Sequence, residues 1–102
     1  MIKVYIYRNQ NGNIYGFKAM QHGDPVVCSA VSILTFNTVN SIEKFTKQSC
    51  VCELEESGFL FCELPDIKDG DYDKDSDLLF NSMLLGLEGI QEQYKKHLKI
   101  ID

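Results

Sequence analysis

The stretch MQHGDPVVCSAVS, residues 20–32, joins a segment that alternates like a β-strand to one with helical spacing. The carboxylate of Asp24 can accept hydrogen bonds from free amides at a helix start. Pro25 suits the first helical turn because its missing N–H would be unpaired there anyway. We therefore expect a helix to open at Asp24-Pro25. This puts Cys28 in about the first turn, six residues after His22, which ends the strand.

A thiol nucleophile needs a cysteine with a base in reach, and a cysteine at a helix N-terminus beside an imidazole meets this requirement. The helix end lowers the pKa of the thiol, and the imidazole can take its proton. The amides at the helix start could also donate to a developing oxyanion. The alternative interpretation makes Cys28 a buried small hydrophobe and His22 a polar strand end, since free cysteine is among the most buried residue types. Residue types and spacing alone favour this second, structural interpretation.

Before this junction the sequence predicts a β-hairpin. Residues 2–8 (IKVYIYR) and 13–21 (NIYGFKAMQ) have the alternation of strands. Asn11-Gly12, between them, supplies the positive φ angles of a tight turn.

After the junction we expect a helix to about Lys47, a second hairpin and a second helix. The hairpin pairs 50–55 with 58–64 and turns at residues 56–58. An acidic loop spans 66–77, the second helix runs from about Lys74 to His97, and residues 98–102 form a short extension or fray. Apolar residues recur every three or four positions along each helix. The first stripe is Val27, Val31, Leu34, Thr38, Ile42 and Phe45, and the second is Phe80, Leu84, Leu87, Ile90 (or Gln91) and Tyr94.

The predicted element order is therefore ββαββα in a single domain, 1–102. Two antiparallel hairpins and two amphipathic helices favour an α+β sandwich, an antiparallel sheet with both helices packed on it.

Composition and charge narrow the function classes. Apolar residues make up 44% and charged residues 25% of the 102 residues, as in an ordinary globular protein. The formal charge of −5 argues against direct nucleic-acid binding, which needs a surplus of cations. No run of 18 apolar residues exists, so we expect no membrane-spanning segment. The first residues lack the apolar stretch of a signal peptide, so we expect a cytoplasmic protein with reduced thiols.

Two arrangements suggest metal sites, and we reject both. Cys50 and Cys52 share a side of one strand and Cys62 lies on its partner, but a fourth ligand and the usual zinc spacing are missing. The alternating carboxylates of the acidic loop resemble a calcium loop, but its sixth and twelfth positions hold Ser76 and Ser82 instead of Gly and Glu. The loop carboxylates are Asp71, Asp73 and Asp75.

The helix start VVCSAVS, residues 26–32, resembles that of the ribosomal-processing cysteine protease family, Prp. This family is recognised by a Gly-His-Ala strand end and an Asp-Ile-Val-Cys-Ala-Ala-Val-Ser-like helix start. His22 matches the first motif. The likeness extends over essentially the whole chain, including the final helix FNSMLLGLEGIQEQY, residues 80–94. The second motif is matched by Val26, Val27, Cys28, Ala30, Val31 and Ser32.

The resemblance implies a small, homodimeric α+β endopeptidase that uses a Cys–His dyad and no metal or organic cofactor. Family members remove an N-terminal extension from a large-subunit ribosomal protein precursor in Firmicutes and related bacteria, cutting after a short aromatic-rich motif. Carried over, Cys28 is the nucleophile and His22 its general base, with Ser32 and Asp24 in supporting roles. The alternatives are a catalytically silent relative that only binds the ribosomal precursor and a dimerising scaffold protein.

This sequence departs from the family pattern at three points. Five residues separate His22 from Cys28, where the family has about a dozen positions and a glycine-containing mobile loop. Pro25 stands where the family has aspartate, and Asp24 is displaced by one. Gln21 replaces the glycine before the histidine.

Overall fold

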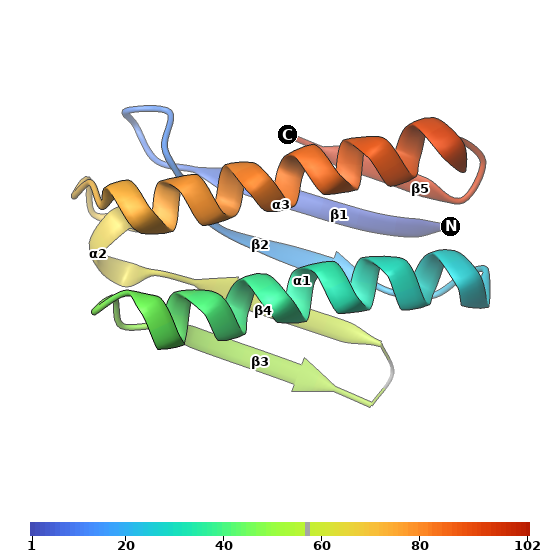
Figure 1. Ribbon diagram of the computed structural model, residues 1–102, viewed down its shortest axis with the longest axis horizontal. Helices are drawn as coiled ribbons and strands as arrows, with labels where there is room; N and C mark the ends of the chain where they lie inside the picture. The colour runs from blue at the N-terminus through green and yellow to red at the C-terminus, as the bar shows by residue number, and fades with distance from the viewer. Residues whose placement is uncertain (57) are drawn as a thin grey trace.

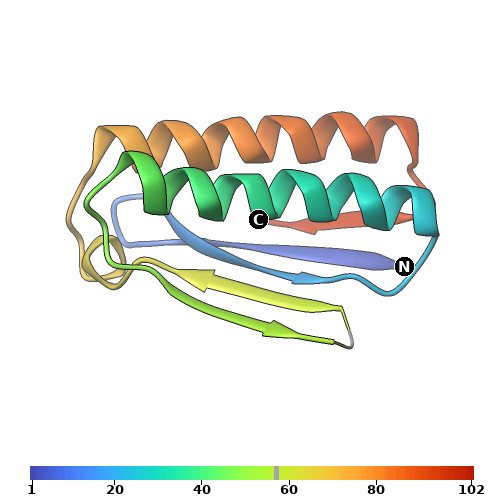
Figure 2. The same ribbon diagram turned by 60° about the horizontal axis from the view of Figure 1, so that its bottom comes forward.

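The computed structural model describes residues 1–56 and 58–102. In chain order the elements are β1 (Ile2–Arg8), β2 (Ile14–Met20), α1 (Pro25–Phe45), β3 (Val51–Glu55), β4 (Phe59–Glu63), α2 (Pro65–Lys68), α3 (Lys74–Gln93) and β5 (Leu98–Ile101). The strands form one sheet in the order β3-β4-β2-β1-β5. The two long helices lie side by side over one face of this sheet (Figures 1 and 2). The predicted α+β class, with helices packed on a sheet, is confirmed.

The sheet is mixed, because a fifth strand joins the expected antiparallel four. β5 pairs in parallel with β1, with Ile2 opposite Leu98. The second helix ends at Gln93, earlier than predicted, and the turn that follows carries the chain back to the free edge of β1. The backbone N–H of Ile2 then donates to the carbonyl of His97 at 3.0 Å. The tail is therefore neither a simple extension nor frayed, and the element order is ββαββααβ.

The first hairpin forms where the sequence predicts it. Gly12 takes a positive φ of 84°, and Asn9 Oδ1 accepts hydrogen bonds from the backbone N–H groups of Asn11 and Asn13. The second hairpin also forms, as β3 and β4. Its predicted turn includes Ser57, which lies outside the described residues.

The first helix differs from the prediction at its C-terminal end. α1 ends at Phe45 because Thr46 is extended and its hydroxyl donates to the carbonyl of Ile42. Phe45 is 67% exposed, so the predicted apolar stripe stops at Ile42. Part of the predicted acidic loop forms the short helix α2, which Pro65 opens.

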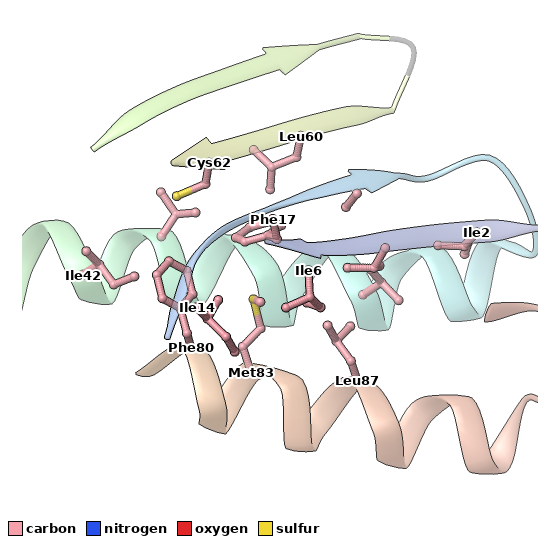
Figure 3. Close-up of a cluster of buried hydrophobic side chains, with 14 of the residues drawn as sticks. Ile2, Ile6, Ile14, Phe17, Ile42, Leu60, Cys62, Phe80, Met83 and Leu87 are labelled. Carbon is pink, nitrogen blue, oxygen red and sulfur yellow. The ribbon is translucent and has the colours of Figure 1, made fainter. Parts of the chain in front are cut away.

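The core lies between the sheet and the two long helices (Figure 3). The rings of Phe17 on β2 and Phe80 on α3 meet edge to face, with centroids 6.4 Å apart. Both side chains are fully buried, so the contact fixes α3 against the centre of the sheet.

By length and composition alone, α1 is apolar enough to cross a membrane, with a mean hydropathy of 1.4 over its most apolar window. It passes this test although polar residues interrupt its apolar runs. The core helix of a globular protein can be equally apolar, and α1 is a helix of this kind because it buries residues against the rest of the fold. Its buried residues are Val27, Val31, Thr35, Thr38, Val39 and Ile42.

Candidate active site

A four-residue connection, residues 21–24, carries the chain from β2 into α1. It is held from two sides. The backbone N–H of Gln21 donates to the carbonyl of Gly58, 2.6 Å away and just before β4. A side chain at Gly23 would begin 3.1 Å from Cγ1 of Ile2, so β1 packs closely against the connection. His22 is thus carried on a short, anchored segment.

Asp24 caps α1 as the sequence predicts. One carboxylate oxygen, Oδ1, accepts hydrogen bonds from the N–H groups of Val26 at 3.0 Å and Val27 at 3.2 Å. The N–H of Cys28 donates to the carbonyl of Asp24 at 2.8 Å. Because Pro25 has no N–H, the amides of the first turn are all engaged. The amides that the sequence predicts as free donors are therefore occupied by Asp24.

The thiol of Cys28 is half-buried and donates to the backbone carbonyl of Gln21 at an Sγ–O distance of 3.5 Å. His22 is the next residue along the connection, and its side chain is exposed. The structure therefore brings Cys28 against the segment that carries His22. Within the described residues, however, no hydrogen bond joins the thiol to the imidazole. Catalytic hydrogen bonds are often long before substrate binds and tighten in the complex.

Gln21, which departs from the family pattern in sequence, has a central place in the structure. Its side-chain Oε1 accepts a hydrogen bond from the hydroxyl of Ser32 at 2.6 Å. Its Nε2 is buried and has no partner among the described residues. The alternation of β2 could have indicated the inward position of Gln21. Phe17 and Ala19 are buried on one face of the strand, and Gln21 is the next residue in the same alternation.

Gln21 therefore touches α1 at two successive turns. Its carbonyl meets Cys28, and its side chain meets Ser32. This double contact sets how the His22 segment lies along the helix. Ser32 thus contacts Gln21, whereas Asp24 caps the start of the helix.

Residues from the two arrangements that suggested metal sites make structural contacts instead. Among residues 1–56 and 58–102, no group of three or more His, Cys, Asp or Glu residues could hold a metal ion. Asp73 caps α3, since its Oδ2 accepts from the N–H of Ser76 at 2.9 Å. Cys50 and Cys62 lie with their sulfur atoms 3.3 Å apart, and Cys62 is paired with Phe17 in the sheet, four positions before Gln21.

A thiol at the start of a helix, set against a histidine-bearing connection on a small α+β sheet, is an arrangement that a cysteine-dependent hydrolase can use. The comparisons with known proteins agree with this class. The chain belongs to the cysteine protease Prp family, whose model matches residues 1–99. It is thus a member of a family of cysteine proteases.

Relatives match over nearly their full length. The ribosomal processing cysteine protease Prp of Bacillus subtilis (strain 168) is 26% identical over 107 residues, covering 98% of this chain and 96% of the relative. Among solved structures, the ribosomal processing protease Prp from S. aureus, in complex with a covalently linked product peptide, is similar with a TM-score of 0.88. It is 24% identical and covers 99% of this chain and 98% of its own. A Streptococcus mutans protein is similar with a TM-score of 0.83 at 23% identity, covering 99% and 96%.

Proposed function

We propose that this protein is a cytoplasmic endopeptidase that removes the N-terminal extension of a large-subunit ribosomal protein, with Cys28 as nucleophile and His22 as general base. Membership of the Prp family supports the substrate class. The observation that carries the residue roles is the contact of the Cys28 thiol with the carbonyl of Gln21, the residue next to His22.

In the proposed reaction, the imidazole of His22 removes the proton of Cys28 and the thiolate attacks the scissile carbonyl carbon. The protonated imidazole then gives its proton to the leaving amine, and water hydrolyses the thioester. The His22 ring is exposed, and no hydrogen bond or ion pair from the described residues holds it. It is therefore free to turn from solvent toward Sγ when a peptide enters and displaces water.

The tetrahedral intermediate needs donors for its oxyanion. The amides of Val26 and Val27 lie at the correct end of α1, but the Asp24 carboxylate accepts from both. If these amides hold the oxyanion, the carboxylate leaves them as the intermediate forms. Asp24 would then keep the site capped between turnovers, and one negative group would replace another at the helix N-terminus.

We also propose a homodimer. The outer faces of the two long helices expose large apolar side chains that a partner copy would cover, since symmetric homodimers are the commonest assembly. Light scattering of the purified protein would test this, with Ile33→Asp as the variant expected to be monomeric. The exposed residues are Val26 (63%) and Ile33 (72%) on α1, and Leu78 (65%) and Leu85 (71%) on α3.

The test of the proposed activity is cleavage of a peptide that carries the extended N-terminus of the ribosomal protein, followed by mass spectrometry. We expect one cut with the unaltered protein and none with Cys28→Ala. His22→Ala should be slowed by about 10²-fold or more, the usual contribution of a general base. Cys52→Ala, which removes an exposed thiol on β3, is the matched control and should cleave normally.

Two results would change the assignment. Equal cleavage by Cys28→Ala would exclude Cys28 as the nucleophile. An intact peptide that nevertheless binds the unaltered protein would make this chain a binding protein for the ribosomal precursor.

A further inference from the structure

A pair of thiols lies at the end of the molecule away from the start of α1, which carries Cys28 (Figure 1). Cys50 comes just before β3 and Cys62 lies on β4, and their sulfur atoms are 3.3 Å apart. Figure 3 shows the Cys62 side chain directed from β4 toward the helix layer, on the side where Ile42 of α1 lies. This distance brings the two sulfur atoms into direct contact, with no chain movement needed to make them meet.

The two thiols have different surroundings. Cys62 is fully buried, and its contact with Cys50 together with burial raises its pKa, so it keeps its proton and donates. Cys50 is half-buried. The hydrogen bond from Cys62 lowers the pKa of Cys50, helped by one from the backbone of Glu63, although burial and the Glu43 carboxylate oppose this. Cys50 is thus the member that ionises first and that solvent can reach, which are the properties of a reactive thiol.

Cys52 provides an internal comparison. It is the direct strand partner of Cys62 and is more exposed than Cys50. Burial of its thiol, with smaller effects of Cys50 and Glu43, raises its pKa. No sulfur–sulfur contact of Cys52 is present among the described residues. Accessibility alone would favour Cys52 as the thiol that is oxidised. The sulfur–sulfur contact and the lowered pKa favour Cys50 instead.

We propose that Cys50 and Cys62 form a reversible oxidation site for hydroperoxides, in which Cys50 reacts first and Cys62 resolves the product as a disulfide. The Cys50 thiolate attacks one peroxide oxygen, the O–O bond breaks, and protonation releases water (or an alcohol) and leaves a sulfenic acid. The sulfur of Cys62 then attacks the sulfur of this sulfenic acid. A second water leaves, carrying the proton of Cys62, and the S–S bond forms. Two thiols are oxidised and one peroxide is reduced.

The disulfide would join the start of β3 to the end of β4 and so close the base of the second hairpin (Figure 1). Closing this loop restricts the unfolded chain, so we expect the oxidised protein to melt several degrees higher than the reduced one. The contact of that hairpin with the active-site connection is at its other end, where Gly58 accepts from Gln21. The proposed oxidation site of Cys50 and Cys62 does not depend on the proposed protease activity.

The experiment uses the full chain with Cys28→Ser, so that the active-site thiol takes no part. The protein is treated with hydrogen peroxide, the free thiols are blocked, and trypsin releases residues 48–68, which contain all three remaining cysteines. We expect this peptide to lose two hydrogen atoms and to regain them with dithiothreitol. Adding Cys52→Ser should leave the loss unchanged and identify the linked pair.

Adding Cys50→Ser instead should abolish the two-hydrogen loss. Adding Cys62→Ala should leave Cys50 as a sulfenic acid that dimedone labels. Either no cross-link in the folded protein or a Cys52–Cys62 link would overturn the proposal. An unchanged melting temperature on oxidation would also contradict it, and this measurement needs no variant at a buried position.

Discussion

The hydroxyl of Ser32 donates to Oε1 of Gln21 at 2.6 Å, one helical turn beyond the catalytic candidate Cys28. The bond ties the end of β2 to the face of α1 that carries the thiol. Gln21 immediately precedes His22, so the same bond also holds the backbone from which the imidazole extends. We therefore expect Ser32 to act as a positioning residue through Gln21.

Removing this bond should slow catalysis without unfolding the protein. We expect Ser32→Ala and Gln21→Ala each to lower kcat by about five- to tenfold, the equivalent of one hydrogen bond of roughly 1 kcal/mol. Because both changes break the same bond, the double variant should lose little more than either single one. Peptide cleavage kinetics give kcat and KM for this cycle. Ser32→Thr keeps a hydroxyl and should restore most of the rate, whereas additive losses would contradict the coupling.

Asp24→Ala separates the capping role from the chemistry. Loss of the cap should lower the free energy of unfolding by about 1 kcal/mol, measured by urea denaturation. It also leaves the amides of Val26 and Val27 open to an oxyanion, so we expect kcat to be retained. Asp24→Ser, which still caps, should recover the stability. A loss of kcat by 10²-fold in a folded Asp24→Ala protein would show that the carboxylate itself acts in the reaction.

Gly58 is predicted to matter for activity as well as for stability. Its φ is +90°, and a Cβ there would lie 3.1 Å from the carbonyl oxygen of Gln21, the acceptor of the Cys28 thiol. Gly58→Ala should destabilise the fold by about 1–3 kcal/mol and lower kcat by displacing that carbonyl. Gly12→Ala is the matched control, because φ is +84° but nothing lies within 4 Å of the added carbon. It should lower the melting temperature with kcat unchanged. Equal kcat values for the two variants would refute the link to the site.

The pairing of Arg8 with Asp102 predicts a pH-dependent contribution to stability. The guanidinium holds both carboxylate oxygens at 2.7 Å and lowers the pKa of Asp102 from its ordinary value of 3.8. Because the folded-state pKa is the lower one, the stabilisation is present above pH 3.8 and disappears as pH falls through the lowered pKa. Both side chains are about one-third exposed, so solvent screening limits the effect to at most about 1 kcal/mol.

Urea denaturation of Asp102→Asn should therefore show a loss of about 0.5–1 kcal/mol at neutral pH and a smaller difference at acidic pH. Asp71→Asn, a change at an exposed loop position, serves as the control. A difference that grows on acidification would contradict the assignment.

Local signals in the sequence were sufficient for the hairpins and for the start of α1. Asn11-Gly12 set a turn through its φ preference, and Asp24-Pro25 set a helix start through capping and a fixed φ. These preferences involve only a few neighbouring residues, so they can be recognised without the rest of the fold. The positions of His22 and Cys28 at the strand-to-helix junction followed from them.

Other features arise from contacts between distant segments. β5 forms because the turn after α3 returns the chain to β1, where Arg8 meets a residue 94 positions away. A four-residue strand has too little local pattern to reveal such a partner. Likewise, Asn-Gly or Asp-Pro signals say nothing about which groups meet Gln21. The contact of Cys50 with Cys62 and the double contact of Gln21 with α1 depend on how the sheet and helices pack. Residue order and local conformation can thus be read along the chain, whereas the partners of each functional group depend on the packing of the whole.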